Sequence, residues 1–261
     1  MISLKTEKEI KIMKEGGKKL AWVFNQVLRE IKPGVRLRQL DSLAEKLIEK
    51  QGGTPSFKTV QSYKWATCIN INQGVVHGIP NDYRIKKGDL VSLDMGMLYR
   101  GFHTDMARTL CVRTKNEKLK TKNLGFLEVG RRALKMATEA AKVGNHVGHI
   151  SVAIEKEIRK AGFSPIEVLT GHGVGKNLHE EPQIPCLLKE EIEKTPLLKS
   201  GMTLAIEVIY AENNPQLVVE EDGWTIKTAD NGLAGLFEDT ILITKKSSII
   251  LTPLETRLEL C

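Results

Sequence analysis

Apolar positions in the first fifty residues recur every three to four residues, which is the spacing of amphipathic helices. Thr6 and Glu9 match a capping box, which satisfies free backbone N–H groups where a helix starts. Apolar residues then recur at roughly helical spacing from Ile10 to Ile31, and Pro33 ends the run. We therefore expect a long helix that begins just after Thr6.

A second amphipathic segment covers residues 37–48 and stops at Gly52. The pattern then changes. Residues 54–112 consist of short apolar runs separated by Gly, Pro, Asn and Asp, which is typical of strands. The same order then repeats, with helices expected at 121–143 and 148–161 and strands within 165–252.

The repeat is also visible in individual residues. An offset of 110 places Gly34 on Gly144 and Pro55 on Pro165, and an offset of 113 places Asp94 on Glu207. We interpret the chain as an internal duplication. The prediction is one α/β (α+β) catalytic domain over 1–261, with halves at about 1–115 and 116–255 that share a site between them.

Composition narrows the class of protein. The chain has 27% charged residues and no apolar run of ~18 residues, so we expect no membrane span. The N-terminus lacks the apolar core of a secretory signal. The four cysteines (Cys68, Cys111, Cys186 and Cys261) show no CxxC spacing, which argues against a zinc ribbon or a disulfide framework. We therefore expect a cytoplasmic protein.

Basic residues are concentrated near the N-terminus. The net charge is +7, and residues 1–50 contribute +5 of it, with twelve Lys/Arg against seven Asp/Glu. A second basic run covers 113–122. Solvated helix faces are the simpler interpretation, because no nucleic-acid motif accompanies the charge. Transient contact of this surface with ribosomal RNA is a secondary hypothesis.

Acidic side chains interrupt apolar or glycine-rich stretches at four places. Asp94 lies in GDLVSLDMG, Asp105 in GFHTDMART, Glu207 in LAIEVIY and Glu238 in GLFEDTILIT. An unpaired buried carboxylate is strongly unfavourable, so each of these acids is exposed, paired with a base or bound to a cation. Lys and Arg are scarce around the last two acids, which favours a cation there.

His172, in GHGVG, adds a nitrogen ligand to the four carboxylates. This oxygen-rich set suits two divalent ions such as Mn, Fe, Co or Zn. Bridging carboxylates hold such ions ~3.5–4 Å apart, and the pair lowers the pKa of water and polarises a carbonyl group. No GxSxG elbow, P-loop or HExxH helix offers another chemistry. The residues alone predict a dinuclear metal hydrolase.

Two further histidines lie in stretches that indicate tight turns, His77 in VVHGIP and His179 in LHEEP. Near the metals, either side chain could donate a proton or hydrogen-bond a substrate carbonyl as charge develops on it. The alternative for each is a structural or solvated histidine.

Six stretches together resemble type I methionine aminopeptidases along nearly the whole chain. They are CININQGVVHGIP (68–80), GDLVSLDMG (88–96), GFHTDMART (101–109), GHGVGKNLHEEPQIP (171–185), SGMTLAIE (200–207) and DGWTIKT…GLFEDTILIT (222–244). The resemblance implies the pita-bread fold, in which two pseudo-symmetric αα-then-β halves surround a central antiparallel sheet. The length resembles the minimal bacterial form.

The resemblance also implies a role for each ligand. Asp94 would chelate one metal ion, Asp105 and Glu238 would bridge both ions, and His172 would bind the other. Glu207 would bind that second ion too and would shuttle the proton of the attacking water.

Substrate contacts follow from the same resemblance. His77 and His179 fall where the family contacts the substrate and its developing oxyanion. Trp224 and Cys68 match positions that line the pocket for the methionine side chain, and Tyr63 and Trp65 are further candidates there. These residues would form a polarizable, aromatic-edged pocket that suits a thioether.

Three positions depart from the family pattern. Val208 stands where proline is usual, so the strand after Glu207 could run differently. Asp239 stands where histidine is common and would add negative charge beside the site. Leu178 replaces a common phenylalanine and could reshape the methionine pocket.

The resemblance predicts a monomer that acts on nascent polypeptides and Met-peptides. One alternative on the same fold is an Xaa-Pro aminopeptidase-like hydrolase, although those proteins usually carry an extra N-terminal domain. Another alternative is a non-catalytic protein that kept the pita-bread fold and binds RNA or the ribosome.

Overall fold

A computed structural model describes residues 2–254, so Cys261 lies outside the described residues. Helices in the described chain are α1 (Glu7–Arg29), α2 (Leu37–Lys50), α3 (Glu117–Ala140) and α4 (Val147–Lys160), with 3-10 turns at Ser56–Thr59 and Ile192–Lys194. None of the helices found between residues 2 and 254 has the length and apolar character needed to cross a bilayer.

Local capping fixes where the helices begin. Thr6 Oγ1 accepts from Glu9 N, and the Glu9 carboxylate accepts from Thr6 N at 2.8 Å, which confirms the predicted capping box. Helix α3 begins earlier than the predicted 121, because Asn116 Oδ1 accepts a hydrogen bond from Leu119 N at 3.1 Å. Part of the basic run at 113–122 is therefore the first turn of this helix.

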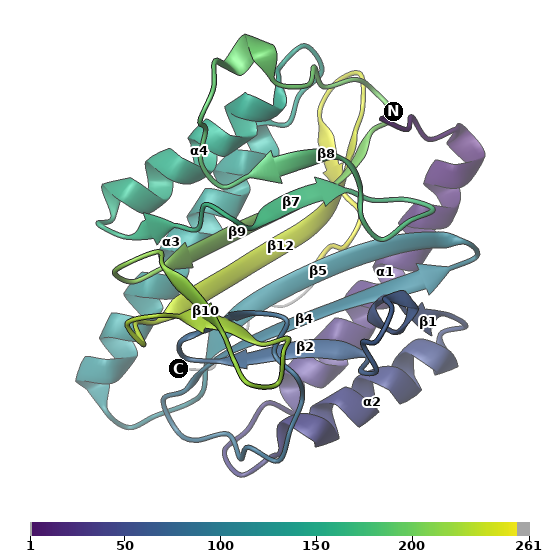
Figure 1. Cartoon of the computed structure of the whole chain (residues 1–261). Coiled ribbons are helices and arrows are strands. Elements are labelled where there is room, and N and C mark those ends of the chain that lie inside the picture. The colour runs from purple at the N-terminus through teal and green to yellow at the C-terminus, as the bar shows by residue number, and fades with distance from the viewer. Residues whose placement is uncertain (1, 255–261) are drawn as a thin grey trace.

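One large antiparallel sheet forms the centre of the molecule (Figure 1). Its main path runs β1-β4-β5-β12-β9-β7-β8, while β2 pairs with β4, β13 with β12 and β6 with β9. The strands are β1 (Thr54–Pro55), β2 (Thr67–Ile71), β4 (Leu90–Tyr99), β5 (Phe102–Cys111), β6 (Ser164–Pro165), β7 (Thr170–Gly173), β8 (Glu180–Pro185), β9 (Thr203–Ala211), β12 (Ala234–Ile243) and β13 (Ser248–Ile250). A smaller sheet joins β10 (Leu217–Val219), β11 (Ile226–Thr228) and β3 (Gly74–Val76).

The long helices cover one face of the large sheet. Helix α1 packs on β4 and β5, and α3 packs on β12 and β9. Gly130 of α3 lies so close to Phe237 that an added Cβ would stand 2.3 Å from the ring. The strand β10 of the smaller sheet lies in front of the large sheet in Figure 1, on the side away from α1 and α3.

The two halves pair their strands in the same register. Thr54 of β1 lies opposite Leu98 of β4, and Ser164 of β6 lies opposite Ala211 of β9. The first members of these pairs are related by the offset of 110 and the second members by the offset of 113. The repeated pairing therefore follows the two offsets found in the sequence.

Candidate metal centre

Strand register places three of the predicted ligands in one row across the large sheet. Asp94 lies opposite Ala107, Ala107 opposite Glu238, and Glu238 opposite Glu207. Residues directly opposite one another in antiparallel strands point to the same face, so the three carboxylates share one side. The small Ala107 side chain leaves space between the first two acids.

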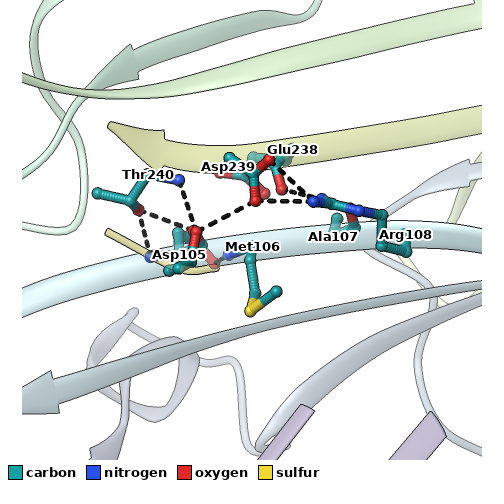
Figure 2. Close-up of polar contacts among 8 residues, drawn as sticks. Asp105, Met106, Ala107, Arg108, Glu238, Asp239 and Thr240 are labelled. Atoms are coloured by element: carbon teal, nitrogen blue, oxygen red, sulfur yellow. Dashed lines mark hydrogen bonds and ion pairs between the residues drawn. The ribbon is translucent and has the colours of Figure 1, made fainter. Parts of the chain in front are cut away.

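The next row on this face carries the other two ligands. Thr240 Oγ1 accepts from Asp105 N and donates to Asp105 O, both at 2.8 Å (Figure 2). Ala205 pairs with Thr240 on one side and with His172 on the other. Ligand atoms of Asp105, His172 and Glu238 all lie within 4.8 Å of one another.

Two carboxylate oxygens of the cluster are buried and unsatisfied. Within residues 2–254, neither Asp94 Oδ1 nor Glu238 Oε1 has a hydrogen-bond partner. Such atoms are costly unless a donor or a cation reaches them. Burial, followed by repulsion from the other acids, raises the pKa of both groups well above the usual range. A divalent cation would satisfy both oxygens, and the residues therefore fit a metal ion.

The remaining two acids follow the same logic. Burial raises the pKa of Asp105 to about 7. Burial, and then the charge of Asp105, raise the pKa of Glu207 to about 8. Groups with such pKa values can exchange protons near neutral pH.

His172 presents a free ring nitrogen to the cluster. Its Nδ1 lies 2.8 Å from the carbonyl oxygen of Gly173, which can only accept, so Nδ1 carries the proton. Burial, and then the neighbouring His179, lower the pKa of His172 to about 4, so the ring is neutral. Nε2 then keeps its lone pair and lies 3.6 Å from Glu207 Oε1. A neutral imidazole oriented by a backbone carbonyl is typical of a metal-binding histidine.

His77 and His179 line the same cavity as the four acids and the histidine of the cluster. The rings of His179 and His172 meet edge-on, with centroids 4.5 Å apart. His77 occupies a left-handed turn with φ of 58°. Burial lowers the pKa of His77 and of His179, so both rings are neutral at neutral pH and each keeps one N–H donor.

The cavity has a volume of about 160 Å³. Part of its lining is an apolar wall, formed by Phe57, Val60, Tyr63, Cys68, Val76, Leu178 and Trp224. The rings of Tyr63 and Trp224 pack edge-on with centroids 5.0 Å apart. Trp65 is not among the lining residues of the described chain; its ring packs edge-on against that of Tyr63, with centroids 5.2 Å apart.

Polar contacts hold the Trp224 turn against the His77 turn. Both Trp224 N and Thr225 N donate to Asp222 Oδ1, at 2.9 and 2.8 Å. Thr225 Oγ1 in turn lies 3.3 Å from the donor Ile79 N, two residues after His77. The aromatic wall and one candidate substrate-binding histidine are therefore positioned together.

The three departures from the family pattern have defined structural outcomes. Strand β9 continues without a register break through Val208. Asp239 points to the opposite face of the sheet and pairs with Arg108, and its charge still adds to the repulsion that raises the pKa of Glu238. Leu178 stands in the cavity wall.

Several lining residues did not stand out in the sequence. Phe57 and Val60 lie in a mostly polar stretch (TPSFKTVQ), Val76 lies in a short apolar run, and only the folded chain brings them to the cavity. The positions of Thr240 and Ala107 at the site become apparent only from the strand register, which places each of them directly beside a predicted ligand.

Comparison with known proteins identifies the class. The profile of metallopeptidase family M24 matches residues 11–245, so the chain belongs to this family of metal-dependent hydrolases. Along its length it is similar to methionine aminopeptidase 1 of Bacillus subtilis (strain 168), at 38% identity over 252 residues, which cover 97% of this chain and 99% of the relative.

Solved structures show the same relationship. The chain superposes on the methionine aminopeptidase of Thermotoga maritima with a TM-score of 0.90 and 39% identity, covering 97% and 99% of the two chains. The prolidase of Pyrococcus furiosus gives a TM-score of 0.77 and 28% identity, and the match covers 97% of this chain but 66% of the prolidase. The predicted resemblance and the pita-bread fold class are confirmed.

Proposed function

We propose that the protein is an aminopeptidase that removes the N-terminal methionine from nascent proteins and Met-peptides, with residues 1–261 as one catalytic domain. One observation carries the proposal: four carboxylates and a neutral histidine share a cavity with an apolar and aromatic wall. Polar chemistry and an apolar side-chain pocket thus adjoin each other, as cleavage next to a methionine requires.

Five residues would hold two divalent ions. Asp94 would bind one ion, His172 and Glu207 would bind the other, and Asp105 and Glu238 would be shared between them. Two such ions lower the pKa of water and stabilise negative charge on a carbonyl oxygen. Mn, Fe, Co and Zn all suit this ligand set.

The protein's own groups would handle the protons. The Glu207 carboxylate would take a proton from the attacking water and return it to the leaving amine. His77 and His179 are neutral, so each can donate its one ring N–H to the substrate carbonyl as negative charge develops there.

The apolar wall would select the side chain. A thioether packs favourably against aromatic ring edges, and Tyr63 and Trp224 form such a surface beside Cys68 and Leu178. The wall lies in the same cavity as the carboxylates, so a bound side chain would bring its own peptide bond next to them.

We further propose that the protein works in the cytoplasm as a monomer. The basic residues of 1–50 support transient contact with ribosomal RNA where nascent chains emerge.

Cleavage of Met-Ala-Ser and of Xaa-Pro peptides by the metal-loaded protein tests the proposal. We expect a strong preference for Met-Ala-Ser, and loss of turnover in Glu207→Gln, which keeps the side-chain volume but removes the proton acceptor. Preference for Xaa-Pro peptides would refute the assigned substrate. Failure to bind any divalent metal would favour a non-catalytic RNA-binding protein instead.

A further inference from the structure

Arg108 and Asp239 lie directly behind the candidate ligands, on the face of the large sheet that the helices cover. Each follows a residue of the ligand row, Ala107 on β5 and Glu238 on β12, and adjacent residues of a strand point to opposite faces. Figure 2 shows Arg108 reaching from β5 to the Asp239 carboxylate on β12.

One guanidinium group ties both strands together at this point. Arg108 Nη2 donates to both oxygens of Asp239, at 2.7 and 2.8 Å. Its Nη1 donates to the carbonyl oxygen of Ala107 at 2.8 Å and also to that of Glu238. The backbone of a candidate bridging ligand is therefore held from the rear, by a donor with fixed fork geometry.

Hydrogen bonds also connect Asp239 to the backbone of Asp105, the second candidate bridging ligand. Thr252 Oγ1 lies 3.2 Å from Asp239 Oδ1 and accepts from Thr240 N at 3.1 Å. Thr240 in turn makes the two hydrogen bonds with the backbone of Asp105. The buried pair thus contacts the backbone of Glu238 directly and that of Asp105 through two threonines.

Stability alone is a weak reason for this pair. The side chains of Arg108 and Asp239 are 15% and 5% exposed, and Phe237, the cross-strand partner of Arg108, is fully buried beside them. Burying two charges among apolar groups costs nearly as much free energy as their attraction returns. The ion pair therefore adds little stability, but it fixes the geometry of the two strands.

We propose that Arg108, held by Asp239, is a positioning residue: it fixes the backbone at Glu238 and thereby sets its carboxylate for metal binding. The inference rests on the proposed function, because it takes Glu238 as a metal ligand. The variant is therefore examined by metal binding and by stability, not by peptide cleavage alone.

The test compares Arg108→Ala with Lys135→Ala. Arg108 and Lys135 both line a second cavity, the rear cavity. Lys135 makes no ion pair within the described chain, so Lys135→Ala is a matched loss of one positive charge. Calorimetric titration with Co²⁺ is expected to show roughly 10–100-fold weaker binding in Arg108→Ala and unchanged binding in Lys135→Ala. Metal-free unfolding by urea gives the stability of each variant independently.

Chemical rescue separates positioning from mere packing. The rear cavity measures about 620 Å³ and is lined by both Arg108 and Asp239, so free guanidinium ion can enter the space that Arg108→Ala vacates. Millimolar guanidinium is expected to recover Co²⁺ affinity in that variant. Wild-type Co²⁺ affinity in Arg108→Ala, with only its metal-free stability lowered, would overturn the inference.

A second, more conservative variant keeps the test possible if Arg108→Ala does not fold. Arg108→Lys keeps a positive charge for Asp239 but cannot hold the acid and two carbonyl oxygens together, so it also is expected to bind Co²⁺ more weakly. Wild-type affinity in Arg108→Lys would again count against the inference. Glu238→Ala distinguishes the two proposals, because normal Co²⁺ binding in that variant would refute the metal centre itself.

Discussion

Removal of the metal ions is expected to make the stability of the protein fall as pH rises. In the metal-free protein the pKa of Asp105 is raised from 3.8 to about 7, chiefly by burial. The folded state then binds a proton more tightly than the unfolded chain does. The stability linked to that proton is complete below pH 4 and is lost as pH rises through 7.

The magnitude follows from the shift. Each pKa unit corresponds to about 1.36 kcal/mol, so Asp105 alone would lower the free energy of unfolding by about 3 kcal/mol between pH 5 and pH 8. Glu207, raised from 4.5 to about 8, acts in the same direction over a slightly higher range. Bound metal reverses the trend, because it requires deprotonated ligands and is held more tightly as pH rises.

Urea unfolding of chelator-treated protein at pH 5, 6, 7 and 8, followed by circular dichroism, measures the effect. Asp105→Asn is the matched control, since it keeps the shape of the side chain but cannot titrate. We expect its metal-free stability to fall by about 3 kcal/mol less than that of the wild type over this range. Parallel curves for the two proteins, or a wild type that gains stability from pH 5 to pH 8 without metal, would refute the reasoning.

Three substitutions test the roles of single residues. Glu238→Ala should abolish cleavage of Met-Ala-Ser and reduce bound metal, measured by elemental analysis; full turnover would contradict a shared ligand. His179→Ala should lower kcat roughly 10²-fold or more with metal content unchanged, and metal loss would mean that His179 is itself a ligand. Trp224→Ala should raise KM for Met-Ala-Ser up to about tenfold, because an aromatic contact with the thioether is lost; an unchanged KM would place the methionine pocket elsewhere.

The sequence was most informative where a local signal controls the structure. The capping box at Thr6 and the stop before Pro33 frame α1 closely. The acids in apolar strands are conspicuous because burying a carboxylate needs a special reason. The two halves could be aligned from a few glycines, prolines and acids, since these residues mark helix ends, turns and the site.

Features that depend on strand register could not be predicted. The Arg108–Asp239 pair requires knowing that β5 and β12 are neighbours and that the two side chains share a face. Without that knowledge, Asp239 was expected beside the site rather than behind it.

The proposed methionine pocket could be predicted only in part from the sequence. Tyr63 and Trp224 are distant in sequence, and only their meeting at 5.0 Å makes a wall. Trp65 has the same chemical character as Trp224 and also packs against Tyr63, yet it does not line the cavity. Residue type thus suggested the pocket, but the folded chain decided which aromatic side chains reach it.

The most direct test of the account is a joint titration of metal-stripped protein with Mn, Fe, Co or Zn, in which bound ions and cleavage of Met-Ala-Ser are measured together. The account predicts no cleavage without metal, restoration by at least one of these ions as the cluster of Asp94, Asp105, His172, Glu207 and Glu238 fills, and no restoration in Asp105→Ala. Undiminished cleavage by the metal-free protein, or full activity in Asp105→Ala, would contradict it.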